Sequence, residues 1–104
     1  GQKLQEARRE LERSVEEALK DKEPTPEEDR VILEQAARDL DRQADELNEP
    51  TMESLANASR TVAETGQRFT RLSEETLNRH REEWQQKLAE MRADADEFIE
   101  QLRP

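Results

Sequence analysis

The stretch that decides the fold is residues 51–102, which read TMESLANASRTVAETGQRFTRLSEETLNRHREEWQQKLAEMRADADEFIEQL. Apolar side chains recur in it every three or four residues from Met52 to Leu102, the spacing of one face of an α-helix. All four prolines of the chain stand before or after this stretch. The pattern therefore predicts one amphipathic helix over about residues 51–103, roughly 80 Å long at the helical rise per residue.

Two features inside the stretch favour a break in that helix. Gly66 lies in its interior, where a glycine costs about 1 kcal/mol relative to alanine. Residues 73–75 (Ser-Glu-Glu) have the composition of a helix start, because a serine hydroxyl accepts from free backbone N–H groups and acids favour the positive end of a helix. We therefore expect an all-α antiparallel bundle or coiled coil of three helices, the third very long, or four helices if the chain breaks near Gly66–Ser73.

Two shorter helices are predicted before residue 51, over about residues 2–22 and 26–48. Pro24 and Pro26 separate them, and residues 25–28 (Thr-Pro-Glu-Glu) are typical of a helix N-terminus. A tight turn near residue 24 places the two apolar seams opposite each other in an antiparallel pair. The seam residues are Leu4, Leu11, Val15 and Ala18 in the first helix, and Leu33, Ala37, Leu40, Ala44 and Leu47 in the second.

Composition and charge exclude several classes of function. The chain of 104 residues is long enough for a single domain (residues 1–104), and it has no cysteine, which excludes disulfides and thiol chemistry. A net charge of −10 argues against nucleic acid and against anionic membranes as partners. No apolar run has the length of a membrane span and no signal peptide is recognisable, so we expect a cytoplasmic protein.

The negative charge is concentrated in residues 23–50, which hold ten acidic and three basic residues. A turn near Pro50 would place this acidic segment beside the nearly neutral residues 51–72, with Arg60 near Asp39. We expect the arginines of one arc, Arg60, Arg68, Arg71 and Arg79, to form ion pairs with this acidic helix. An alternative function uses the acidic face as an antitoxin-like decoy that binds a basic protein, through Asp29, Glu34, Asp39, Asp41, Asp45 and Glu46.

The predicted helix lengths leave part of the third helix uncovered. The two shorter helices reach only to about residue 75, beyond which an apolar stripe would project into water. We therefore predict that this stripe pairs with another copy of the chain, a dimer being favoured, or with a helical protein partner. We expect Trp84 to pack as a seam residue within the bundle. As an alternative, Trp84 anchors the interface, because tryptophan is enriched at interface hot spots. The predicted interface residues are Leu77, Trp84, Leu88, Met91, Phe98, Ile99 and Leu102.

The sequence contains no recognisable catalytic, cofactor or metal site. His80 is the only histidine, and with Glu83 it falls short of the four ligands of a typical zinc site. The leading prediction is therefore a non-enzymatic helical assembly module. A designed bundle without natural function is an alternative, although Arg81 on the apolar seam and Gly66 inside a helix are unlike an idealised design. A lipid-binding function fits less well, because the apolar faces are narrow and basic residues are few.

Overall fold

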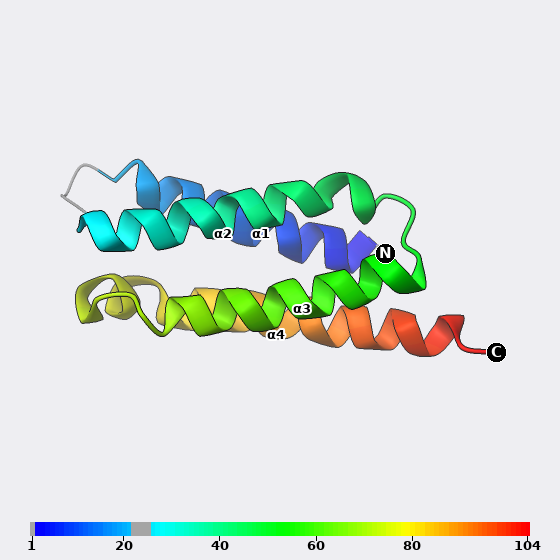
Figure 1. The fold of residues 1–104 in the computed structure, drawn as a ribbon. Coiled ribbons are helices and arrows are strands. Elements are labelled where there is room, and N and C mark those ends of the chain that lie inside the picture. Colours follow the sequence, from blue (N-terminus) through cyan, green and yellow to red (C-terminus); the bar gives the residue numbers. More distant parts are fainter. Residues whose placement is uncertain (1, 22–25) are drawn as a thin grey trace.

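The computed structural model describes residues 2–21 and 26–104, and this part of the chain forms four α-helices. Each helix runs antiparallel to the one before it, and the first also packs against the last, so that the four form a closed ring around an elongated core (Figure 1). The molecule measures 49 × 21 × 17 Å. The helices are α1 (Gln2–Leu19), α2 (Glu27–Glu46), α3 (Met52–Phe69) and α4 (Glu74–Leu102).

The prediction of an all-helical chain is confirmed, whereas the prediction of three helices is wrong. The long third helix ends at Phe69, and a separate helix begins at Glu74. Gly66 lies within α3 and does not interrupt it. The backbone N–H groups of residues 70–72 bond to carbonyl oxygens three residues earlier, which tightens the end of α3 into 3₁₀-type turns. Of the two features expected to favour a break, only the Ser73 cap marks the start of a new helix.

Ser73 begins α4 because both its side chain and a carboxylate from α2 satisfy free donors there. Its hydroxyl oxygen accepts from the backbone N–H of Thr76 at 3.3 Å. The buried Asp29 carboxylate accepts from the Ser73 backbone N–H at 3.0 Å, and from the hydroxyls of Ser73 and Thr76 at 2.6 Å each. Burial alone would raise the pKa of Asp29, but these hydrogen bonds outweigh it and lower the pKa. A contact across 44 residues thus fixes the break.

The register of the first hairpin agrees with the sequence prediction. Gln5 Nε2 donates to the carbonyl of Ala44 at 2.8 Å, and the buried Arg8 donates to the carbonyl of Leu40 at 3.1 Å. These contacts place the two predicted seams opposite each other. Helix α1 ends three residues before the predicted Lys22, while Lys22 itself and the predicted Thr25 cap lie outside the described residues.

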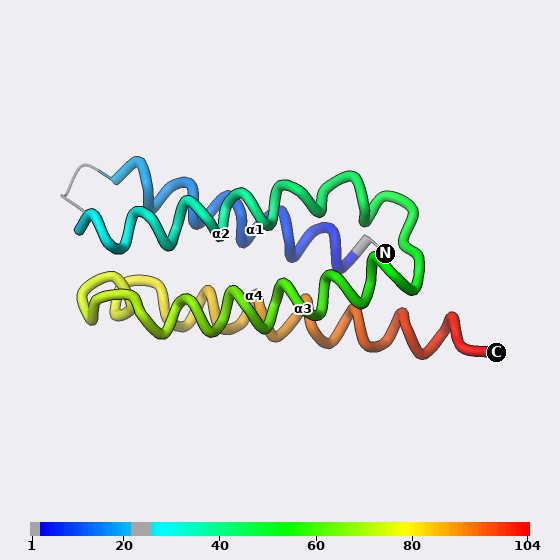
Figure 2. The backbone as a smooth tube through the Cα atoms, in the orientation of Figure 1, coloured from blue at the N-terminus to red at the C-terminus, as the bar shows by residue number. Residues whose placement is uncertain are grey.

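The α3–α4 hairpin is displaced along the bundle axis relative to the α1–α2 hairpin. Trp84 contacts Ser14 and Lys87 pairs with Glu10, so the antiparallel register places the first turn of α1 beside about Asp96. The last six residues of α4 therefore lie beyond the start of α1. Figure 2 shows this end of α4 extending past the other helices.

The core runs along the whole ring and is built from the predicted seams. The predicted seam residues Ala37 and Ala44 are only half-buried, and Met52 is exposed. The largest core side chains that are almost completely buried are Leu4, Leu11, Leu33, Leu40, Leu55, Trp84 and Met91.

Candidate functional site

The seven predicted interface residues divide into three groups. Trp84, Leu88 and Met91 are buried by the chain itself, at 2%, 8% and 0% exposure. Leu77, Phe98 and Ile99 are half-buried against the core, and Leu102 is 43% exposed. The premise that everything after residue 75 projects uncovered is therefore wrong, because the chain turns at residues 70–73 and α4 returns along α1.

Trp84 joins three helices of the bundle. Its indole N–H donates to the hydroxyl oxygen of Ser14 on α1 at 2.8 Å, and that hydroxyl donates in turn to the carboxylate of Glu83. Its ring packs against Phe69 of α3 with centroids 4.9 Å apart. The polar and apolar contacts together make Trp84 an anchor inside the chain, whereas an interface role would need its indole to be accessible.

His80 lies one turn before Trp84 and stacks on its indole ring, with centroids 4.4 Å apart and the ring planes within 6°. Burial lowers the pKa of His80 below its usual value, so the imidazole is uncharged at pH 7. Among residues 2–21 and 26–104, no three His, Cys, Asp or Glu side chains are grouped so as to hold a metal ion. His80 thus serves as a packing partner for Trp84.

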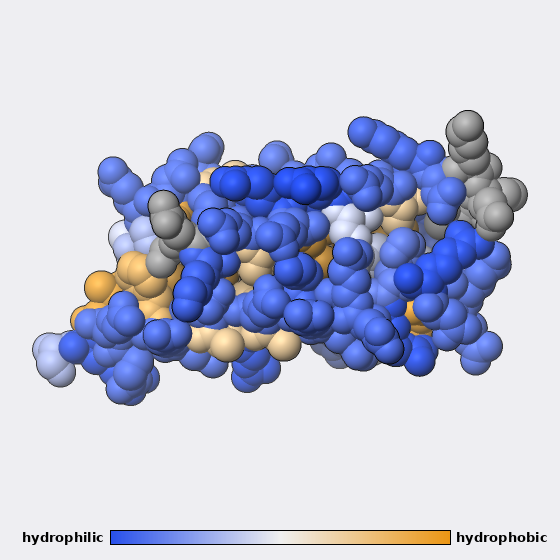
Figure 3. Space-filling model, turned by 180° about the vertical axis from the view of Figure 1, so that it is seen from behind, coloured by the Kyte–Doolittle hydropathy of each residue, from blue (hydrophilic) through white to orange (hydrophobic). Residues whose placement is uncertain are grey.

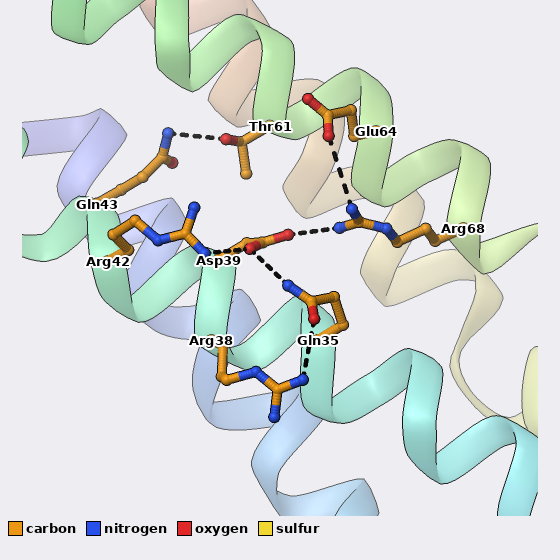
Figure 4. A network of polar contacts seen from close by, with 8 residues as sticks. All are labelled: Gln35, Arg38, Asp39, Arg42, Gln43, Thr61, Glu64 and Arg68. Carbon is orange, nitrogen blue, oxygen red and sulfur yellow. Dashed lines mark hydrogen bonds and ion pairs between the residues drawn. The ribbon is translucent and has the colours of Figure 1, made fainter.

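A network of polar side chains connects α2 and α3 (Figure 4). The buried Asp39 carboxylate accepts from Gln35 at 2.9 Å, from Arg42 at 2.7 Å, and from Arg68 of α3. Burial would raise the pKa of Asp39, but the hydrogen bonds and charges of these neighbours lower it. The expected neighbour Arg60 instead donates to Asn57 at 2.6 Å, and Arg68, two turns further along α3, takes its place at Asp39. Asp39 holds the least extensive of the four helix interfaces together through charge.

The acidic residues of α2 are therefore not one uniform exposed face. Asp29 and Asp39 are buried and hydrogen-bonded within the chain. Only the other four residues of the predicted acidic face are exposed, namely Glu34, Asp41, Asp45 and Glu46.

The arginines of the predicted arc have different surroundings. Arg68 pairs with Asp39 and lies 3.7 Å from Glu64. Arg79 pairs with Glu75 at 2.8 Å and lies 3.8 Å from Asp21. The expected pairing of this arc with the acidic second helix is thus confirmed for Arg68, through Asp39.

An apolar surface remains at the end of the bundle where α4 projects. Phe98 and Ile99 are half-buried there, and Leu102 is exposed. The contact between Phe69 and Trp84 sets a register in which Met52, 46% exposed, lies beside the last turn of α4. Figure 3 shows apolar side chains gathered at this end. We name Met52, Phe98, Ile99 and Leu102 the apolar end. Sequence periodicity assigned Met52 to the core and so missed its exposure.

Comparisons of the chain with protein-family models, with curated proteins and with solved structures find no match. Within the described residues, no helix is both long enough and apolar enough to cross a membrane. The apolar end is a surface that the fold leaves incompletely covered.

Proposed function

We propose that the protein is a non-enzymatic helical assembly module that associates with a second copy of itself through the apolar end. The observation that carries this proposal is the incomplete cover of Phe98, Ile99 and Leu102. These residues follow Asp96, the position beside which α1 begins, so their part of α4 lies beyond the start of α1. Apolar surface in water favours association with a second apolar surface.

The shape of the projecting hairpin favours a second copy as the partner. Helix α4 extends past the start of α1 by about six residues, or roughly 9 Å. Two such ends, related by a two-fold axis, fit side by side, each filling the place where α1 is missing in the other. A two-fold contact of this kind closes after two copies and gives a dimer.

The contact involves only the first turn of α3 and the last turns of α4 in each copy. Stable interfaces involve about 20–30 residues from each partner, whereas the apolar end consists of four. The proposed dimer is therefore weak and dissociates in the micromolar range or above.

Charge near the apolar end opposes association. Glu53, Asp96, Glu97 and Glu100 are exposed around it. Like charges that approach in a dimer repel each other, and salt screens the repulsion. Added salt should therefore strengthen this dimer, whereas it would weaken binding of the acidic α2 residues to a basic protein.

Sedimentation equilibrium from micromolar to millimolar concentration tests the proposal. Wild-type protein should show a mass that rises with concentration, and Leu102→Glu should remain a monomer. Val31→Glu is the matched control, because Val31 is an exposed apolar residue (57%) on α2, away from the apolar end. A wild-type protein that stays monomeric throughout, or a Val31→Glu variant as defective as Leu102→Glu, would contradict the proposal.

A further inference from the structure

A pocket of about 280 Å³ opens between the last turn of α3 and the first half of α4. Four large apolar side chains line it, together with the polar residues Thr70 and Gln85. The Trp84 indole N–H already donates to Ser14. Trp84 therefore offers a ligand in this pocket its apolar ring and no free hydrogen-bond donor. The residues that define the pocket are Gly66, Phe69, Leu77, Arg81, Trp84 and Leu88.

Gly66 in the pocket wall is explained neither by conformation nor by steric need. It lies inside α3, and no glycine of the described residues has a positive φ. A Cβ atom built at Gly66 would lie 3.8 Å from Leu88 Cδ1, an ordinary contact distance. An alanine would therefore fit and favour the helix. What the glycine preserves is the open space above Leu88.

Arg81 at the rim breaks a second local rule. It occupies a position in the apolar periodicity of α4, three residues before Trp84, yet it is exposed and forms no salt bridge with the described residues. The paired arginines Arg68 and Arg79 show that acids are available elsewhere on the surface. In a chain of net charge −10, an unpaired guanidinium beside an apolar pocket is a local site for an anion.

We propose that this pocket binds a small amphiphilic anion, a compact apolar ring or branched alkyl group that carries one carboxylate. The apolar group fills the space above Leu88 that Gly66 leaves open, and the carboxylate accepts hydrogen bonds from Arg81. Gln85 at the rim offers a further amide donor. Drug-sized ligands occupy pockets of about 300–1,000 Å³, so this pocket fits a ligand at or below the lower end of that range. Residues that break local rules tend to mark functional sites, and here two of them meet in one pocket.

This binding site is independent of the proposed dimer, because it shares no residue with the apolar end. Cyclohexanecarboxylate is a suitable probe, and cyclohexylmethanol is its uncharged counterpart. Titration is followed by NMR at two signals, the indole N–H of Trp84, the only tryptophan, and the backbone N–H of Gly66. The Gly66 signal reports on the pocket wall, and the Trp84 signal reports through the indole ring that lines the pocket.

The wild-type protein should bind the carboxylate saturably and about five- to tenfold more tightly than the alcohol, the difference expected for one charge-assisted hydrogen bond near the surface. Arg81→Gln should abolish this preference, whereas Arg92→Gln, an exposed arginine elsewhere on α4, should retain it. Gly66→Leu should fill the pocket and prevent saturable binding of either probe. Circular dichroism checks that Gly66→Leu is folded. If the leucine disturbs the fold, Gly66→Ala is the milder variant, because its methyl group fits beside Leu88 without a clash.

Three outcomes would overturn the proposal. The first is a shift of the Trp84 and Gly66 signals that rises linearly with probe concentration in the wild-type protein. The second is equal affinity for carboxylate and alcohol. The third is unchanged binding in folded Gly66→Leu, which would place the probe elsewhere, for instance at Leu102 in the apolar end.

Discussion

Replacing Gly66 by alanine should make the protein more stable. Gly66 is in the interior of α3 and adopts a negative φ, so the backbone does not need a glycine there. The new methyl group would meet Leu88 Cδ1 at 3.8 Å, with no closer contact to overcome. The substitution therefore tests whether the space beside Gly66 is real.

The expected gain has two parts. The difference in helix propensity between alanine and glycine contributes about 1 kcal/mol to the free energy of unfolding. A buried methylene-sized group contributes about 0.8 kcal/mol, and a half-buried methyl at Gly66 about half of that. The sum is about 1.4 kcal/mol, which for a domain of this size corresponds to a rise in Tm of roughly 5–10 °C.

Urea unfolding followed by Trp84 fluorescence and by circular dichroism measures this change. Ala63→Gly is the reciprocal control, because Ala63 is exposed one turn earlier in α3 and should lose about 1 kcal/mol of stability. A loss of stability in Gly66→Ala, together with the expected loss in Ala63→Gly, would refute the reasoning. It would mean that α4 approaches α3 more closely at Gly66 than the structure shows.

Three further predictions concern the polar contacts between helices. Asp29→Ala should cost about 3 kcal/mol of stability in urea unfolding, because it leaves buried donors at the start of α4 unpaired, while the exposed neighbour Glu28→Ala should change stability by less than about 0.5 kcal/mol. The pKa values of Asp29 and Asp39 are lowered by folding, so both carboxylates stabilise the fold above their ordinary pKa near 3.9. This stabilisation should disappear as the pH falls through the lowered pKa values of the folded state. Asp39→Asn should therefore reduce the dependence of the unfolding free energy on pH in acid, and an unchanged dependence would contradict this role. Ser14→Ala should cost about 1 kcal/mol and change the emission of Trp84, whose indole N–H loses its acceptor; unaltered stability and emission would contradict the contact.

Local sequence signals identified much of the fold correctly. The helical spacing of apolar residues gave the all-α class and the seams of α1 and α2, since periodicity reports which face of a helix is buried. Helix α3 begins with a capping box, in which the Ser54 N–H donates to Thr51 Oγ1 at 3.1 Å and the Thr51 N–H donates to Ser54 Oγ at 2.7 Å. Such caps depend on neighbouring residues alone and so can be recognised in one sequence.

The candidate sites were less predictable. The apolar stripe of the last helix was recognised, but its division into a buried part and the apolar end depends on where α1 begins beside α4. The pocket at Gly66 and Arg81 was present in the sequence only as two irregularities of the helical pattern. That the two lie together follows from the contact between α3 and α4, which no single helix contains.

Local composition alone determined that this chain forms amphipathic helices, where two of its turns fall, and that its surface is strongly acidic. Whether the chain continues straight after Phe69 or turns back was left open, because the gain from the Ser73 cap and the cost of ending a helix are similar in size. The tertiary structure decided in favour of the turn, since it buries Trp84 between three helices and gives the start of α4 the carboxylate of Asp29. These contributions come from residues distant in the chain, and their combined free energy exceeds any local preference.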